Sequence, residues 1–353
     1  MSKKWQMGAV VAVTTALLVS SLSGCAPTGA PSEGEPEGAE PTYQYEWRAG
    51  TDEPQDSELG ERLTAFCDEV KKETEGRVDI TPYFSSTLGS WEIMGDMLMR
   101  NDVQLVYDAV NSAYDPRLAA AYYMPYLVSN YEEYWQLYGP GGLVRTLYSE
   151  IAEPLGIVQF GAVARGMSGL TTTEVPPSPG DPDVPKNMKI RVMGLKECRL
   201  TFERLGYLTT AISYDEVYSA LQTGIVEGQM GGGAIQAWQF RDVQKCYIQY
   251  NDFCESLWFQ MNKQSVDSLT GHDRQVIAGA ADHHSREQFE YVQQMDEEYL
   301  EKLQGYGLEI IMLTQEELDA CATAIRQDVW PELESMIGTV IMYQLYDALG
   351  IEY

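Results

Sequence analysis

Apolar and polar residues alternate with two different periods along the first third of the chain. Strict alternation over residues 43–47 predicts a strand, and apolar positions at helical spacing over 59–70 predict a helix. Further runs predict a strand at 78–82, a helix at 91–99 and a strand at 103–107. This β-α-β-α-β order favours a parallel sheet with right-handed crossovers.

The same pattern returns in the middle of the chain. Strands are predicted at residues 158–164, 189–193, 207–212 and 225–230, with helices between them. Prolines crowd residues 176–185, which predicts a surface loop between two of these strands. Because a chain of 353 residues has room for about two domains, two α/β units are expected.

Residues 271–303 contain no proline and are rich in Ala, Gln, Glu and Arg. Globular helices usually run 8–20 residues, whereas a helix over this stretch would extend roughly 45 Å at ~1.5 Å per residue. In a two-domain protein such a helix would cross both domains. A coiled coil is the alternative, but the apolar residues keep no strict heptad.

Two other helix starts carry the pattern of a capping box, at residues 213–216 and 314–317. The second would open a C-terminal helical stretch over 315–349. Pro331 is expected to interrupt that stretch, because proline cannot donate the hydrogen bond that a helix interior requires.

The N-terminus has the features of an export signal. Residues 1–24 combine a short basic start with an apolar run too short to span a membrane. The signal ends in Leu-Ser-Gly followed by Cys25, which resembles a bacterial lipobox and implies a lipid anchor on Cys25. Residues 25–42 are rich in Pro, Gly and Glu and predict a disordered tether. The protein is therefore expected outside the cytoplasm, anchored to the cell membrane at the cell surface or in a periplasm, unless the signal is an ordinary one with a chance cysteine.

Composition excludes several classes of partner. A net charge of −29 argues against nucleic acid and against docking on an anionic membrane through a basic patch. The chain has six Cys without a Cys-x-x-Cys pair and only three His, so no metal centre is expected. Cys246 and Cys254 could pair with each other, and the sequence leaves this open.

No motif calls for catalysis or for a cofactor. The glycines at 231–233 lack the Gly-Lys-Ser of a phosphate-binding loop, and the Ser at 168 lacks the spacing of a nucleophile elbow. His283 and His284 are adjacent on the long predicted helix. They are therefore expected to point about 100° apart, as a solvated pair that cannot share one ion.

Two arginines stand out as candidate ligand-binding residues. Arg165 and Arg191 lie at or just beyond the ends of predicted strands, where open α/β sheets bind ligands. The planar guanidinium matches a carboxylate with two parallel hydrogen bonds. Structural ion pairs with neighbouring acids are the alternative, since this chain is rich in acids.

Three nearby strings resemble the solute receptors of tripartite ATP-independent periplasmic (TRAP) transporters, DctP family. They are the Lys-Ile-Arg-Val that contains Arg191, the Glu-Val-Tyr-Ser-Ala-Leu-Gln-Thr-Gly of residues 216–224, and the Val-Glu-Gly-Gln of 226–229. The resemblance extends to residues 86–89 and 124–130 and, by order of elements, to nearly all of the chain after the tether.

The resemblance implies a periplasmic-binding-protein-like α/β fold with two lobes around a ligand cleft, joined by hinge strands and a long helix that spans both lobes. Lobe I would take residues 43–162 plus about 253–290, and lobe II residues 163–252 plus about 291–353. It also implies a non-enzymatic, monomeric receptor without cofactor, which delivers a small organic carboxylate to a two-subunit membrane permease driven by an ion gradient.

The family pattern also implies roles for particular residues. Arg191 would clamp the ligand carboxylate, Arg165 would assist, and Tyr214 would line the cleft. Where the family usually has Glu-Asn-Pro, this chain has Met-Gly-Gly, so the glycines at and after Gly231 are expected to leave room for the ligand.

Two further departures bear on the ligand. Arg48 could add a second cationic contact, although a surface arginine beside acids explains it equally well. Trp91 stands where a polar residue is common and, together with the 23 Tyr, favours a larger or aromatic acid. Three alternatives stay open: a receptor for an ATP-driven ABC importer, a secreted α/β enzyme acting on a carboxylate, and a sensor subunit that contacts a receptor kinase.

Overall fold

The computed structural model describes residues 44–351. The predicted signal, Cys25 with its predicted lipid anchor, and the predicted tether lie outside the described residues. Within residues 44–351, no helix is long and apolar enough to cross a membrane. All five cysteines of this part are buried and free, so Cys246 and Cys254 are not paired with each other.

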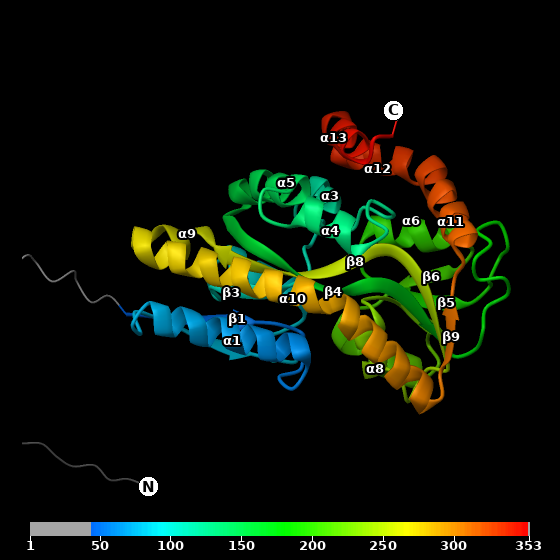
Figure 1. The fold of residues 1–353 in the computed structure, drawn as a ribbon, viewed down its shortest axis with the longest axis horizontal. Coiled ribbons are helices and arrows are strands. Elements are labelled where there is room, and N and C mark those ends of the chain that lie inside the picture. The colour runs from blue at the N-terminus through cyan, green and yellow to red at the C-terminus, as the bar shows by residue number, and fades with distance from the viewer. Residues whose placement is uncertain (1–43, 352–353) are drawn as a thin grey trace, which may run out of the picture. The chain divides into compact units, whose positions relative to one another are not determined.

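In the described part of the chain, nine strands form one mixed sheet, in the order β2-β1-β3-β8-β4-β7-β5-β6, with β9 added on β8 (Figure 1). Their bounds are β1 Tyr45–Gly50, β2 Val78–Tyr83, β3 Leu105–Asp108, β4 Ile157–Thr172, β5 Lys189–Val192, β6 Leu208–Ala211, β7 Gly228–Gly231, β8 Cys246–Asn262 and β9 Glu309–Met312. The strands β1, β2 and β3 pair in parallel, as do β5, β6 and β7, which confirms two α/β units.

The antiparallel strands β4 and β8 join the two units. The C-terminal end of β8 pairs with β3, whereas the C-terminal end of β4 pairs with β7. Between these ends, β4 and β8 pair with each other along their length, with three breaks in register between Gln159 and Gly169. Both strands therefore belong to both units, and their irregular middle lies where the units meet.

These two long strands extend well beyond the sequence prediction. The strand predicted at 158–164 continues to Thr172, and the 17 residues of β8 were not predicted. Nearly every residue of β8 is buried, polar ones such as Asp252 and Glu255 included. With both faces covered, its sequence shows no alternation of apolar and polar positions.

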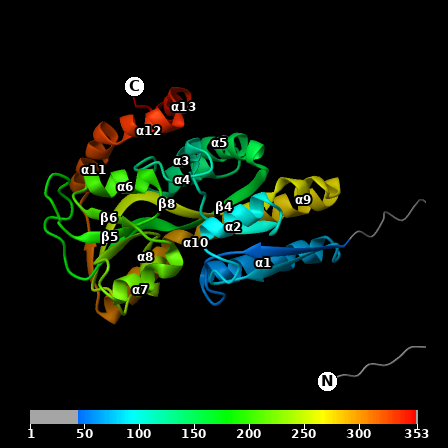
Figure 2. The same ribbon diagram turned by 180° about the vertical axis from the view of Figure 1, so that it is seen from behind.

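The helices cover both faces of the sheet (Figures 1 and 2). The α-helices are α1 Glu58–Glu73, α2 Trp91–Met99, α3 Ala119–Tyr122, α4 Tyr131–Tyr138, α5 Leu143–Ala152, α6 Lys196–Arg204, α7 Val217–Gln222, α8 Ala234–Gln239, α9 Lys263–Asp267, α10 Gly271–Tyr306, α11 Gln315–Asp328, α12 Trp330–Ile337 and α13 Thr339–Leu349. Short 3-10 helices are η1 Pro116–Leu118, η2 Glu153–Leu155 and η3 Tyr214–Glu216. Figure 2 shows α7 and α8 next to β5 and β6.

The long helix is confirmed as a single element of 36 residues, α10. It begins at Thr270, whose side chain accepts a hydrogen bond from the backbone N–H of Asp273, and ends at Gly307 in the left-handed conformation. It packs against α1 on one unit and against α8 on the other, and crosses β4 between them (Figure 1). The helix thus spans the junction of the two units.

The C-terminal helices follow the prediction with one adjustment. The capping box at Thr314 and Glu317 is present. The helical stretch breaks twice, before Trp330 and at Gly338, whose φ of +91° favours glycine. Pro331 lies in the first turn of α12, where a missing N–H costs nothing.

Candidate ligand-binding site

A small buried cavity lies where the two units meet. Side chains from the ends of β1, β3 and β5 reach it, together with residues from the middle of β4 and β8. Its lining consists of Asp52, Trp91, Asp108, Ala109, Arg165, Arg191, Met193, Tyr214, Gln236 and Glu255. At about 20 Å³ it has room for about one water molecule.

Arg191, in β5, is 2% exposed. Its Nε donates to the carbonyl of Ile212 at 2.8 Å and its Nη1 donates to the carbonyl of Met230 at 3.3 Å. No carboxylate among residues 44–351 forms an ion pair with it. Burial therefore lowers the pKa of Arg191, opposed by the attraction of Glu255. Backbone carbonyls thus orient the guanidinium without neutralising its charge.

Arg165, in the middle of β4, has the opposite surroundings. Its Nη2 lies 2.5 Å from Glu53 Oε1 and 3.9 Å from Asp52 Oδ1, and its Nη1 lies 3.3 Å from Glu255 Oε1. Burial acts to lower the pKa of Arg165, but the attraction of Glu53 and Glu255 outweighs it and raises the pKa. The protein's own carboxylates thus neutralise this guanidinium.

Tyr214 lies against both arginines. The centre of its ring is 5.3 Å from Cζ of Arg165 and 5.9 Å from Cζ of Arg191, within the range of a cation–π contact. Its hydroxyl donates to Gln239 in α8. The ring therefore connects the two guanidiniums without neutralising either.

The capping box predicted at Ser213 is wrong. The helix begins instead with η3, and the Ser213 side chain caps no backbone N–H. Its hydroxyl donates to Glu92 Oε2 at 3.1 Å. Since Glu92 belongs to α2 of the first unit, the bond links the two units beside Trp91 and Tyr214.

Two carboxyl groups complete the cavity wall. The backbone N–H of Asp52 donates to Asp108 Oδ2 at 3.2 Å, and Asp52 Oδ1 accepts no hydrogen bond among the described residues. Burial raises the pKa of Asp52 to about 7, against the attraction of Arg165. Burial and the neighbouring Asp52 raise the pKa of Asp108. Both groups are held where a negative charge is unfavourable.

The structure gathers four of the sequence candidates in the cavity wall: Trp91, Arg165, Arg191 and Tyr214. Arg48 lies elsewhere, exposed on β1, where it donates to the carbonyl of Asp102. A surface position was the alternative that the sequence left open, although the contact is to a backbone carbonyl and not to an acid.

Gly231, the last residue of β7, and Gly232 after it do not leave room, contrary to expectation. A Cβ on Gly231 would lie 2.8 Å from Oε1 of Gln236, and one on Gly232 would lie 2.7 Å from Oε2 of Glu255. The backbone N–H of Gly232 donates to the same Glu255 carboxylate. Small residues at 231 and 232 therefore let the chain approach Gln236 and Glu255 closely, and no space is left over.

Sequence reasoning missed the acids of the cavity. Asp52 and Asp108 follow or end strands of the first unit, so the strand-end argument applied to the arginines would have found them. Glu255 carries no local signal, because its place depends on the register that sets it opposite Gly166. Met193, Ala109 and Gln236 are equally unmarked in the sequence.

The adjacent histidines differ from their expected geometry. His283 Nδ1 and His284 Nε2 lie 2.8 and 3.1 Å from the same oxygen of Glu69 in α1. Their rings also approach Glu287. The pair is therefore not splayed apart in solvent, and the three groups lie close enough for one metal ion. The contacts to Glu69 and Glu287 already explain the arrangement without an ion.

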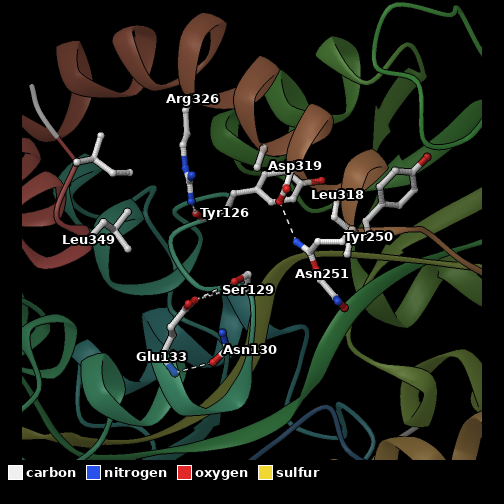
Figure 3. A pocket seen from close by; sticks show the side chains of 13 residues that line it. Tyr126, Ser129, Asn130, Glu133, Tyr250, Asn251, Leu318, Asp319, Arg326 and Leu349 are labelled. Atoms are coloured by element: carbon white, nitrogen blue, oxygen red, sulfur yellow. Dashed lines mark hydrogen bonds between the residues drawn. The ribbon is translucent and has the colours of Figure 1, made fainter.

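A larger hollow of about 420 Å³ lies between the start of α4, β8 and α11 (Figure 3). Arg326 reaches into it and donates to the carbonyl of Tyr126 at 2.6 Å. Glu133, Asp319 and Asn251 also line it. It shares no lining residue with the cavity around Arg191, and it brings together no second guanidinium or aromatic cage.

The comparisons with known proteins decide the family. The model of bacterial extracellular solute-binding protein, family 7 (DctP), matches residues 49–335. The chain belongs to the DctP family. This family consists of solute receptors of the TRAP type and not of enzymes, in agreement with the sequence prediction.

Individual relatives are distant. The sialic acid-binding periplasmic protein SiaP of Vibrio cholerae is 24% identical over 79% of this chain and 85% of its own. The ectoine-binding periplasmic protein TeaA of Halomonas elongata is 24% identical over 57% of this chain. The matched region spans 60% of TeaA, and only 39% of protein y4mM of Sinorhizobium fredii, which is 30% identical over 61% of this chain.

Solved structures share the two-lobed fold. A TRAP periplasmic solute binding protein of Ralstonia eutropha H16, with bound (S)-2-acetolactate, has a TM-score of 0.79 and 22% identity, covering 87% of this chain and 99% of its own. The sugar acid binding protein DctPAm of Advenella mimigardefordensis, in complex with galactonate, has a TM-score of 0.78 and 20% identity, covering 87% and 98%. The expected α/β fold is thereby confirmed.

Proposed function

We propose that the protein is the extracytoplasmic receptor of a TRAP-type transporter, which binds a small organic acid through Arg191 and delivers it to an ion-driven permease. One observation carries this proposal: Arg191 is buried in the cavity wall, oriented by two backbone carbonyls, and lacks a carboxylate partner among residues 44–351. A buried guanidinium without a counter-ion is costly, and a ligand carboxylate would supply one.

The ligands of the relatives support an acid. The solved structures carry D-erythronate, galactonate, acetolactate, succinate and orotic acid. These molecules differ in size and shape and share a carboxylate. A receptor of this family that positions one free guanidinium can therefore take the group common to them.

The small cavity implies a movement. A space for about one water cannot admit an organic acid, so the two lobes have to separate for entry. The irregular middle of β4 and β8 is the proposed hinge, with lobe I at residues 43–162 plus about 253–290, and lobe II at 163–252 plus about 291–353. Bonds such as Ser213–Glu92 and Ser112–Glu197 at 2.6 Å would break on opening.

A thermal-shift screen tests the receptor role. Because a ligand that binds only the folded state stabilises it by mass action, the cognate acid should raise the melting temperature in proportion to the logarithm of its concentration. Acids with keto, hydroxy, amino, dicarboxylate and aromatic groups form the panel, with neutral sugars as controls. Binding of a neutral sugar and of no acid would overturn the carboxylate role. Uptake that requires ATP instead of an ion gradient would overturn the transporter type.

The lipid anchor is a separate part of the proposal, supported by the Leu-Ser-Gly-Cys sequence that ends at Cys25. Metabolic labelling with a clickable fatty acid should mark the wild type and not Cys25→Ser. An unlabelled wild type, released to the medium or periplasm, would refute the anchor and leave the receptor role intact.

A further inference from the structure

We propose that the ligand of this receptor carries a positively charged nitrogen as well as a carboxylate, with the carboxylate at Arg191 and the cation between Asp52 and Asp108. The inference rests on the proposed function and narrows its substrate class from organic acids in general to zwitterions.

Carboxyl groups outnumber guanidinium groups around the cavity. Asp52, Asp108 and Glu255 line it and Glu53 lies directly behind, against the guanidiniums of Arg165 and Arg191. A ligand with only negative charge would add to this excess. A zwitterion adds no net charge, and its two ends match the two kinds of group that line the cavity.

Arg165 does not relieve the two aspartates. Its nitrogens lie at 2.5 and 3.3 Å from Glu53 and Glu255, whereas the nearest approach to Asp52 is 3.9 Å. Asp108 forms no ion pair within residues 44–351. Hydrogen bonds to Asp108 come from the backbone N–H groups of Asp52 and Ala109. The carboxyls of Asp52 and Asp108 are therefore the unneutralised pair of the cavity.

Asp52 points to a missing donor. Its side chain is 6% exposed, and its Oδ1 is buried without a hydrogen-bond partner. Buried acceptors are normally paired. An ammonium group offers up to three N–H donors, enough to serve Asp52 and Asp108 together. Trp91, in the same wall, presents an aromatic ring, to which cations are also attracted.

Protonated aspartates are the competing explanation. If Asp52 and Asp108 were neutral in the complex, they would donate to hydroxyl or carbonyl oxygens of the ligand, and a plain hydroxy acid would bind best. The two explanations make opposite predictions for ligands that differ only in an amino or hydroxyl group.

Calorimetry at about pH 7.5 with matched pairs separates them. Each pair contains a 2-amino acid and the 2-hydroxy acid of the same carbon skeleton, from alanine and lactate up to phenylalanine and phenyllactate, and a cyclic amidine acid extends the cationic series. We expect a member of the cationic series to bind at least about tenfold tighter than any plain acid. Equal or tighter binding of a plain acid would overturn this inference while supporting the proposed function. Binding of neither series at about 10 mM would count against both.

Two variants test the aspartates directly. Asp52→Asn and Asp108→Asn remove a buried carboxylate without changing side-chain size, so both should fold, as the unfolding curve of the free protein will show. Each should weaken zwitterion binding about tenfold or more, and reduce or reverse the preference over the matched hydroxy acid. Glu46→Gln, an exposed change of equal charge on β1, is the control. If both variants keep the wild-type preference, the cation does not lie at these residues and the inference fails.

Discussion

Arg165 and Arg191 lie in the wall of one cavity, are equally buried and contact the same tyrosine ring, yet they differ in their partners. Arg165 is surrounded by Glu53, Glu255 and, at a longer distance, Asp52. Apart from that ring, Arg191 is held by backbone carbonyls and has no carboxylate partner among residues 44–351. Carboxylates of the protein neutralise the Arg165 guanidinium. Backbone carbonyls orient the Arg191 guanidinium but do not neutralise its charge.

This difference separates a structural role from a binding role for the same side chain. A buried ion pair resists the loss of either partner, because the remaining charge has no compensation. A buried charge held by neutral dipoles is instead available to an incoming counter-ion. Burial alone therefore does not indicate which arginine binds ligand. The groups that contact each guanidinium do indicate it.

The largest expected effect comes from breaking the ion pairs of Arg165 with Glu53 and Glu255. Arg165→Met leaves Glu53 and Glu255 buried without their cation and should lower the free energy of unfolding by about 3–5 kcal/mol. Arg191→Met removes a charge that has no ion-pair partner among residues 44–351, so it should cost much less. Urea denaturation of the ligand-free proteins measures both.

The control for this comparison is Arg199→Met, which breaks an exposed pair with Glu203 and should change stability by no more than ~0.5 kcal/mol. If Arg165→Met proves as stable as this control, Glu53 and Glu255 do not depend on Arg165. The contrast between the two arginines would then disappear.

For ligand binding, in contrast to stability, Arg191 should matter more than Arg165. Arg191→Lys keeps the charge and loses the planar fork, so the affinity for the cognate ligand should fall at least tenfold, which is ~1.4 kcal/mol. Arg48→Lys, a change of the same kind at an exposed position, should leave the affinity unchanged. Calorimetry with the ligand found in the screen gives the result, and an unaltered affinity in Arg191→Lys would remove the clamp from the proposal.

Much of the fold was predictable because its signals are local. The 36 residues of α10 follow from a long stretch without proline between Thr270 and Gly307, and the short parallel strands follow from brief apolar runs closed by turns. The strand β8 gave no such signal. It is buried on both faces and includes Asp252 and Glu255, whose partners come from distant parts of the chain.

The residues of the site likewise divide into those with a local sequence signal and those without one. Trp91, Arg165, Arg191 and Tyr214 could be named from sequence because they stand at strand ends or match family strings. The neutralisation of Arg165 could not be predicted from sequence, since Glu53 and Glu255 reach it only through the sheet order and the β4–β8 register. Asp52 and Asp108 could have been named, but in so acidic a chain nothing distinguished them from other acids.

A third test concerns Asp52, whose carboxyl group Arg165 approaches only to 3.9 Å. The pKa of Asp52 rises on folding from the usual ~3.9 to about 7, mainly through burial. Asp52 faces Asp108, Glu53 and Glu255 as well as Arg165, Arg191 and the Tyr214 ring. A raised carboxyl pKa favours the folded state at low pH, so this contribution should be lost as pH rises from about 4 to about 7.

Asp52→Asn should therefore flatten the decline of stability across that window, at ~1.4 kcal/mol for each unit by which the pKa is raised. Glu46→Gln changes the net charge equally and should keep the wild-type slope, which separates the local effect from repulsion across the acidic surface. Chemical unfolding at several pH values supplies both curves. Parallel curves for the wild type and Asp52→Asn would show that the carboxyl titrates normally and that Arg165 neutralises it after all.

The smallest expected effect concerns the bond that places Tyr214 between the two arginines. Ser213 donates to Glu92 across the two units, and its side chain caps no helix. Ser213→Ala should therefore cost about 0.5–1.5 kcal/mol, and a double-mutant cycle with Glu92→Gln should give a coupling of similar size. A cycle with Glu216→Gln, the partner that a capping box would require, should give none. Coupling to Glu216 and not to Glu92 would mean that η3 is held by its own helix, and that contact between the units does not fix the ring shared by Arg165 and Arg191.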